Sequence, residues 1–282
     1  MSRGVIIFAQ NNADVDYIKL ATFAARQVQK HLDLPVSLIT DSRGWLETSQ
    51  PNHPFDKIID VEYTSVAQKK KFHDGALTGK SLEWRNFARN RAYDLTPYET
   101  TLVIDSDYII NSNVLKFAFN RDIELQIYSN STDLAGWRDT SEFKRINEFS
   151  IPFYWATAFI FQKTKITQAF FDLIAYIKAN WNYYRVLYNI DSTLFRNDYA
   201  FSIAIHIMSG KCDSNFVTEL PGSMVYITDK DLLVSGKDNK MQFLVEKKNY
   251  PGEYLMVKTE NLDVHIMNKF SLSRYIDGGL GV

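Results

Sequence analysis

The chain has 282 residues, enough to bury a large hydrophobic core and close to the upper size of a single domain. Hydrophobic residues make up 45% and charged residues 23%, which excludes a disordered or fibrous protein, and the net charge of -1 excludes attraction of the whole molecule to nucleic acid. The single cysteine, Cys212, excludes an internal disulfide and a multi-cysteine zinc site. No apolar run is long enough to span a bilayer, and we expect a cytoplasmic protein.

The first third of the chain alternates predicted strands and helices. A buried strand is predicted at residues 5–8, followed by an amphipathic helix over 15–32 with Asp14 as its N-cap. Strands follow at 36–40, ending at Asp41, and at 57–61. A strand, helix, strand order at this spacing predicts a right-handed crossover with parallel strands.

The middle of the chain contains its strongest predicted strand, at 101–104. A basic helix is predicted before it, over 82–93, and the Lys69-Lys70-Lys71 run is expected in a mobile loop. Later strands are predicted at 124–128 and 156–162, helices at 166–181 and 198–208, and short β segments at 224–227, 241–245, 254–258 and 262–266. The expected fold class is α/β, with a mixed sheet flanked by helices and a less regular C-terminal β segment.

Three Asp-x-Asp triplets occur, and only their context distinguishes them. Asp14-Val-Asp16 lies at a helix start and Asp229-Lys-Asp231 in a polar turn, where caps or solvated carboxylates are the default. Asp105-Ser-Asp107 instead follows the buried strand at 101–104. Ligands of open α/β sheets bind outside the carboxyl ends of the strands, so this pair is directed at a candidate site.

Two carboxylates at a strand end suit a divalent cation that binds a diphosphate. Mn²⁺ or Mg²⁺ held by carboxylates neutralises the negative charge that a diphosphate leaving group gains when its bond to a sugar breaks. Alternation along an extended segment would direct residues 105 and 107 to the same side.

The sequence resembles the GT-A glycosyltransferases, particularly the retaining branch of glycogenin and bacterial galactosyltransferases. Residues 4–9 match the first nucleotide-binding strand, and residues 101–110, TLVIDSDYII, match the strand with the metal motif. Residues 154–162, YWATAFIFQ, are similar to a strand that in the family often reads Asn-Ala-Gly before a hydrophobic run. The resemblance implies one GT-A domain over 1–282, with a nucleotide-binding half at 1–110 and an acceptor half with a C-terminal closing segment at 111–282.

The resemblance also implies roles for single residues. Asp105, Asp107 and His265 would hold the metal, and Asp198 falls where the family has an Asp-Gln pair close to the reacting sugar. Lys269 follows His265 by four residues, whereas related enzymes place a phosphate-binding lysine six residues after the histidine. Donor contacts would come from a set spread over the chain: Ala9, Asn11, Asp41, Lys80, Arg85, Arg89, Ser106 and Lys269.

Each of these residues also has a structural alternative. Asp105 and Asp107 can be strand-end carboxylates, His265 a hydrogen-bonded core histidine, and Asp198 the N-cap of the helix that follows it. Arg85 and Arg89 can form a solvated helix face rather than touch phosphate. These alternatives stay open on the sequence alone.

The sequence also has features of other functional classes. Residues 74–81 resemble a P-loop, but Asp74 replaces the first glycine and a polar, lysine-rich stretch precedes it, which argues against an NTPase. The expected reaction moves a sugar, with retention, from a UDP-sugar to a hydroxyl of a glycan, lipid or protein. The short, Asn- and Tyr-rich sequence is also similar to bacteriophage-encoded transferases, for which the location is the host cytoplasm and the acceptor a hydroxymethylated base in DNA. A protein that binds nucleotide sugars or nucleic acid without catalysis is the alternative of another class.

Overall fold

The computed structural model describes residues 2–62, 68–84, 89–136, 144–147, 150–211 and 216–278. A seven-stranded sheet runs through the molecule, and in it only β10 is antiparallel to its neighbours. Its strands, in spatial order, are β3 (Lys57–Asp60), β2 (Val36–Thr40), β1 (Arg3–Phe8), β6 (Thr100–Asp105), β10 (Trp155–Gln162), β8 (Leu125–Tyr128) and β11 (Thr218–Glu219). The predicted mixed α/β sheet is confirmed.

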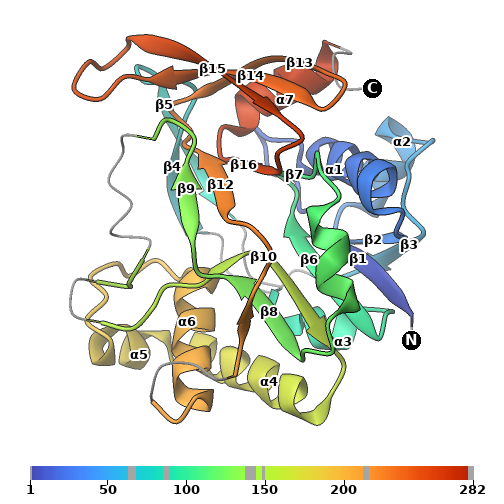
Figure 1. The fold of residues 1–282 in the computed structure, drawn as a ribbon, viewed down its shortest axis with the longest axis vertical. Coiled ribbons are helices and arrows are strands. Elements are labelled where there is room, and N and C mark those ends of the chain that lie inside the picture. The colour runs from blue at the N-terminus through green and yellow to red at the C-terminus, as the bar shows by residue number, and fades with distance from the viewer. Residues whose placement is uncertain are drawn as a thin grey trace.

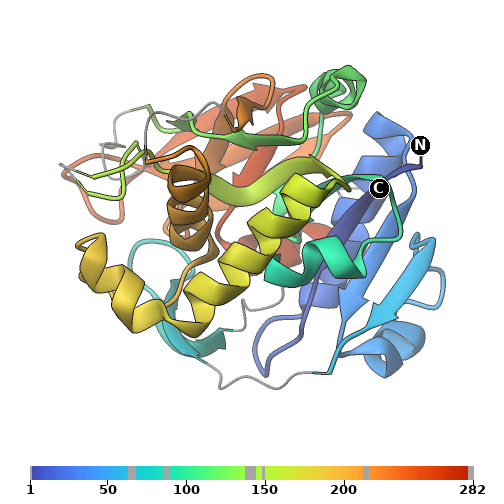
Figure 2. The same ribbon diagram turned by 90° about the horizontal axis from the view of Figure 1, so that it is seen from below.

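Hydrophobic cores lie on both faces of this sheet. Successive side chains of a strand point to opposite faces, so Val5 and Ile7 pack in one core with α1 (Tyr17–Leu32), while Ile6 packs in the other. The second core contains the apolar sides of α4 (Lys165–Ala179) and α6 (Asn197–Met208), which cover β10 in Figure 2. The nearly complete burial of the strands at 36–40 and 100–105 follows from this double coverage.

Smaller sheets adjoin the central one (Figure 1). The order β7-β16-β12-β9 forms a four-stranded sheet, β13-β14-β15 an antiparallel three-stranded sheet, and β4-β5 a hairpin. Their bounds are β4 (Gln68–His73), β5 (Gly79–Trp84), β7 (Tyr108–Ile109), β9 (Ser131–Asp133), β12 (Met224–Ile227), β13 (Leu232–Lys237), β14 (Lys240–Glu246), β15 (Tyr254–Glu260) and β16 (Val264–Ile266). The less regular C-terminal β segment is thus confirmed.

The remaining helices are short. They are α2 (Arg43–Ser49), η1 (Arg89–Arg91), α3 (Ala92–Leu95), η2 (Val114–Asn120), α5 (Trp181–Leu187) and α7 (Lys269–Asp277). In the described part of the chain, no helix has the length and hydrophobicity needed to cross a membrane.

The start of the first long helix differs from the prediction. Helix α1 begins at Tyr17, and its N-cap is Asp16, whose carboxylate accepts the Lys19 N–H at 3.0 Å. Asp14 lies before the cap and pairs with Lys80 instead, at 3.5 Å. Both aspartates suit a cap by type, and only the path of the polar loop before the helix decides between them.

The predicted basic helix over 82–93 is wrong at its start, is an α-helix only from residue 92, and includes residues 85–88, which lie outside the described residues. Residues 79–84 form strand β5, residues 89–91 a 3-10 turn, and only 92–95 an α-helix. Leu82 and Trp84 are spaced two apart, which is the strand period, and β5 pairs with β4 over six residues. The lysine run, predicted in a mobile loop, lies in β4 for the same reason, because Lys70 and Phe72 alternate on one face of the hairpin.

Candidate active site

The carboxyl ends of β1 and β6 open onto a pocket of about 320 Å³. Parallel strands that end together leave a crevice outside the sheet, and the side chains that follow them line it. The lining joins residues from both ends of the chain: Phe8, Gln10, Tyr17, Lys70, Phe72, Trp84, Arg89, Asp105, Ser106, Asp107, Trp155, Thr157, Arg196, Asp198, Thr228, Asp229, His265, Met267 and Lys269.

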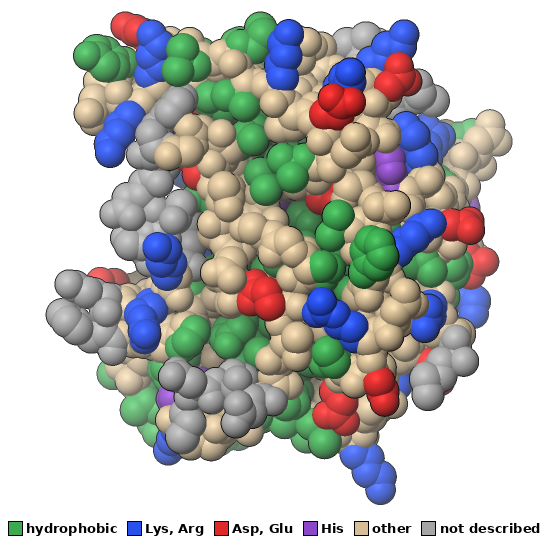
Figure 3. All heavy atoms as spheres, viewed as in Figure 1, with side chains coloured by type: hydrophobic (Ala, Val, Ile, Leu, Met, Phe, Trp, Pro, Cys, Tyr) green, Lys and Arg blue, Asp and Glu red, His purple; other side chains and the backbone are tan. Residues whose placement is uncertain are grey.

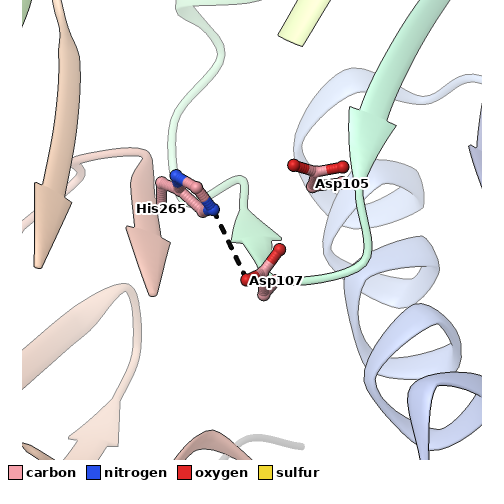
Figure 4. Close-up of side chains that lie close together, drawn as sticks. All are labelled: Asp105, Asp107 and His265. Carbon is pink, nitrogen blue, oxygen red and sulfur yellow. Dashed lines mark ion pairs between the residues drawn. The ribbon is translucent and has the colours of Figure 1, made fainter. Parts of the chain in front are cut away.

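Asp105, Asp107 and His265 converge in this pocket (Figure 4). Each offers one ligand atom, and these atoms all lie within 4.8 Å of one another. His265 Nε2 faces Asp107 Oδ2 at 3.4 Å, and the imidazole Nδ1 is buried without a hydrogen-bond partner among the described residues. The three predicted metal residues are therefore brought together by the fold.

Pairing between β7 and β16 places the histidine opposite the acidic motif. Strand β6 ends at Asp105, the chain turns, and β7 then pairs antiparallel with β16, with Tyr108 opposite His265. The Ile266 N–H donates to the Asp107 carbonyl at 2.8 Å, which extends this pairing by one residue. Backbone hydrogen bonds, rather than the side chains themselves, thus fix the distance between residues 107 and 265.

Asp107 and Lys269 form a buried ion pair. The Lys269 ammonium donates to Asp107 Oδ2 at 2.7 Å, and the two side chains are only 13% and 5% exposed. Burial tends to raise the pKa of Asp107, but the charges of Lys269 and His265 outweigh it and hold that pKa well below the usual range. For Lys269, burial is likewise outweighed by Asp107, and the pKa is raised. Lys269 also begins α7, whose N-terminal dipole adds positive potential to the pocket.

Arg89 is the cationic partner of Asp105. Its guanidinium forms an ion pair with that carboxylate and also donates to the carbonyl of Ala156 at 2.8 Å. Burial lowers the pKa of Arg89 to about 10, opposed by the charges of Asp198 and Asp107. The side chain stays cationic at neutral pH and spans the space between β6 and β10.

The sequence left open that Asp198 is the N-cap of the helix that follows it, and the structure shows that it is not. Helix α6 begins at Asn197, and the carboxylate of Asp198 accepts the Ala156 N–H at 3.0 Å and the Arg196 guanidinium at 2.8 Å. Arg196, whose pKa is raised by Asp198 against the effect of burial, also lies over the ring of Tyr199 at 5.1 Å. Asp198 therefore joins the helix to β10 and faces the pocket.

The predicted donor-binding residues other than Arg89 are divided between the pocket and the rest of the molecule. Ser106 and Lys269 line the pocket, whereas Ala9, Asn11, Asp41 and Lys80 do not. The Asn11 side chain accepts the Ile18 N–H at 3.0 Å, so it satisfies a backbone donor in the first turn of α1, and Lys80 is largely exposed beside Asp14. Arg85 lies outside the described residues.

Several lining residues were not predicted from the sequence. Lys70, Phe72 and Trp84 enter from the hairpin, and Arg196 from the residue before α6. Asp229 belongs to the third Asp-x-Asp triplet, read from the sequence as a polar turn, and it faces the pocket from the loop between β12 and β13. The strand period of residues 68–73 was the available signal for Lys70, because Lys70 shares a face with Phe72.

The residues present fit a divalent metal ion. One imidazole nitrogen and two carboxylates are a donor set for Mn²⁺ or Mg²⁺, and their ligand atoms lie close enough to share one ion. Asp107 Oδ1 accepts no hydrogen bond from any described residue, which leaves a carboxylate oxygen available to a cation.

Comparisons with known proteins do not show a family for the chain, so the function is argued from the geometry of the pocket. No protein-family model matches the chain, and no curated protein does. Among solved structures, the glycosyltransferase GlyE of Streptococcus pneumoniae TIGR4 aligns at 13% identity and a TM-score of 0.45, covering 78% of this chain and 46% of that one. The galactosyltransferase LgtC, in complex with donor and acceptor sugar analogs, aligns at 12% and 0.46, covering 77% and 72%. A putative glucose-1-phosphate thymidylyltransferase from Bacillus anthracis aligns at 11% and 0.41, covering 77% and 86%.

The chain therefore spans less than half the length of GlyE. All three structures have TM-scores below 0.5, and two different classes of transferase are represented among them.

Proposed function

We propose that the protein is a metal-dependent glycosyltransferase of the GT-A type that takes its sugar from a nucleotide-diphosphate donor. The observation that carries the proposal is the convergence of Asp105, Asp107 and His265 at the carboxyl end of β6, in a pocket that also holds Lys269. A carboxylate pair beside a buried lysine suits a diphosphate bound together with a divalent cation.

The charges that line the pocket support this choice. Four cations, Lys70, Arg89, Arg196 and Lys269, accompany four carboxylates, those of Asp105, Asp107, Asp198 and Asp229. The lining is therefore balanced on its own, and a bound divalent cation would leave it positive. A diphosphate supplies the negative charge that this arrangement lacks.

When bound, Mn²⁺ or Mg²⁺ would stabilise the negative charge of the departing diphosphate. The chain's own residues would hold and orient it: Lys269 from the start of α7, and Arg89 through its contact with Asp105. Catalysis of this kind depends on charge stabilisation more than on a protein base.

Metal dependence is the primary test. Protein freed of metal with a chelator should neither hydrolyse nor transfer from a nucleotide sugar, and added Mn²⁺ or Mg²⁺ should restore both reactions. Asp105→Asn keeps the size of the side chain and should lose the metal-dependent rate, with a thermal melt as the control for folding. Full activity of Asp105→Asn in chelator would exclude the metal role.

For the donor we propose a UDP-sugar, which rests on the family resemblance and not on a base contact in the pocket. Calorimetry with UDP, GDP, CDP and dTDP in Mn²⁺ compares the bases directly. Stronger binding of GDP than of UDP would exclude this choice.

We also propose that the reaction retains the anomeric configuration. An inverting enzyme needs a carboxylate base for the attacking hydroxyl, whereas Asp198 is held by the Ala156 N–H and by Arg196 and is suited to orienting the donor. Asp198→Asn should then slow the reaction less than Asp107→Asn. The anomeric coupling in the proton NMR spectrum of the product tests this, since an inverted product excludes the proposed mechanism.

The acceptor is approached by a screen of wild-type protein with nucleotide sugars, in which glycan, lipid and peptide hydroxyls and oligonucleotides with hydroxymethylated bases are compared. Transfer to the oligonucleotide alone would select the DNA alternative. Binding of a nucleotide sugar with neither transfer nor hydrolysis would select the non-catalytic alternative.

A further inference from the structure

The β4–β5 hairpin has two different faces. Lys70 and Phe72 alternate along β4 and line the pocket together with Trp84 of β5. All three lysines keep exposed surface, but Lys69 and Lys71 belong to the other face, because successive side chains of a strand point to opposite sides. Lys70 therefore faces the pocket, whereas Lys69 and Lys71 do not.

Among the described residues, Lys70 is the pocket cation without a carboxylate partner. Arg89 pairs with Asp105, Arg196 with Asp198 at 2.8 Å, and Lys269 with Asp107 at 2.7 Å. No described carboxylate lies within 4.0 Å of the Lys70 ammonium, which rests over the rings of Trp84 and Phe72 at 5.1 and 5.6 Å from their centroids. A cation held over aromatic rings in this way keeps its charge available to an anion.

The same aromatic ring connects Lys70 to the metal cluster. The Lys269 ammonium lies 5.7 Å from the centroid of Phe72, so two lysines approach one ring, and Lys269 in turn binds Asp107. Protein atoms packed around the ammonium lower the pKa of Lys70 to about 8, and the positive charges of Lys269 and Arg196 act in the same direction. Part of the Lys70 residue remains exposed to solvent. An anion bound between the two lysines would relieve this repulsion.

Contacts at both strands fix the position of the hairpin. The Asp229 carboxylate accepts the His73 N–H at 2.9 Å, and Asp74, in the turn, forms a bidentate pair with Arg274 at 2.7 Å for each bond. On β5, the Asn12 side chain donates to the Glu83 carbonyl at 2.8 Å. The backbone that carries Lys70 is therefore held in place before any ligand arrives, which reduces the ordering cost of binding.

We propose that Lys70 of the β4–β5 hairpin binds the diphosphate of the nucleotide-sugar donor, which would lie between the ammonium groups of Lys70 and Lys269. This assignment rests on the proposed function and adds to it a donor-binding residue that comes from a separate two-stranded sheet. The hairpin is then a fixed wall of the donor site that supplies one charge and two aromatic rings.

The test is calorimetry in Mg²⁺ with the nucleoside diphosphate that wild-type protein binds best among UDP, GDP, CDP and dTDP, and with the corresponding nucleoside. Lys70→Met should raise the Kd of the diphosphate about tenfold or more and change the Kd of the nucleoside less than about twofold. Lys70→Arg, which keeps the charge, should restore most of the affinity. Lys69→Met and Lys71→Met remove the same charge from the outer face and should leave both values unchanged.

The outcomes separate the two proposals. Unchanged diphosphate affinity in Lys70→Met, or an equal loss in Lys69→Met and Lys71→Met, would overturn the assignment of Lys70 while leaving the proposed function in place. Absence of any metal-dependent diphosphate binding by wild-type protein would overturn both. A thermal melt of each variant verifies that it is folded.

Discussion

Asp107 and Lys269 depend on each other for charge compensation inside the pocket, where both are mostly buried. Removing one partner of a buried pair leaves the other charge uncompensated. We expect Asp107→Asn to lower the free energy of unfolding by about 3–5 kcal/mol and Asp107→Asn with Lys269→Met to recover most of that loss. Denaturant unfolding of the two single variants and the double variant measures the coupling. Additive losses in the double variant would contradict this pairing.

The charge of Lys70 gives donor binding a pH dependence. Its pKa is lowered to about 8 in the free protein, by burial first and then by Lys269 and Arg196, while Asp229 and Asp107 act in the opposite direction. A bound diphosphate favours the protonated form, so affinity should be full below pH 8 and fall as the pH rises through 8 toward 9. The raised pKa of Lys269 keeps that residue charged over the same range.

Calorimetry at several pH values from 7 to 9 measures this decline, and Lys70→Arg should abolish it because an arginine stays charged. A decline of the same size in Lys70→Arg would assign the titration to another group.

At the scale of elements, the pairing of β7 with β16 is what sets the candidate metal site. Asp263 supports it from the residue before β16, since its Oδ1 accepts the backbone N–H groups of Asn111 and Ser112, each at 2.8 Å. Asp263→Ala would leave two buried donors unsatisfied, and we expect a loss of about 2–4 kcal/mol in stability together with weaker Mn²⁺ binding. Thermal melts and metal titrations measure the two effects.

Asp263→Asn is the matched control for this prediction, because its amide oxygen can accept the same two hydrogen bonds. It should stay within about 1 kcal/mol of wild-type stability or above it. Equal damage in the alanine and asparagine variants would show that the two hydrogen bonds do not support the pairing.

Buried elements were the ones that the sequence predicted well. Residues 36–40 and 101–104 are fully buried in strands with both faces covered, and the acidic pair at the end of the second strand lies where the topology of the sheet directs a ligand site. The hairpin was predicted wrongly because residues 68–84 are half-exposed and lysine-rich, so hydrophobic periodicity gives little contrast there. Its place comes from contacts such as Asp229 to His73 and Asp74 to Arg274, which join segments remote in sequence.

The candidate site likewise has residues that the sequence could predict and residues that it could not. Asp105 and Asp107 could be predicted from one short segment, whereas the pairing of Arg196 with Asp198 or the approach of Lys70 to Phe72 and Trp84 requires the tertiary structure. A single sequence contains neither the partner nor the distance of such contacts. Asn11 illustrates the opposite case, since a polar residue after the first strand suggests a ligand contact but accepts a backbone N–H of the first turn of α1 in the structure.

At the scale of the whole molecule, the net charge is close to zero, and charged side chains are concentrated in the pocket. The net charge is -1, and the face in Figure 3 shows positive and negative side chains interspersed. The pocket, by contrast, concentrates four cations and four carboxylates in a small volume. Attraction of a phosphorylated donor should therefore depend on the bound metal and on the pocket lysines more than on the overall charge.

The pocket also joins distant parts of the chain, and this gives the last prediction. Its lining comes from residues 8–107 on one side and 155–269 on the other, so a ligand that bridges them should stabilise the folded protein as a whole. A ligand at about one hundred times its Kd adds roughly 2.7 kcal/mol, which corresponds to a rise in Tm of about 5 °C for a protein of this size. We expect that rise for wild-type protein with a nucleoside diphosphate and Mn²⁺ together, and a smaller one with either alone, because each ligand supplies the charge that the other requires. Asp105→Asn should lose the part that depends on Mn²⁺. Differential scanning calorimetry measures these shifts, and an equal rise with the nucleoside diphosphate in chelator would show that the metal cluster takes no part in binding the donor.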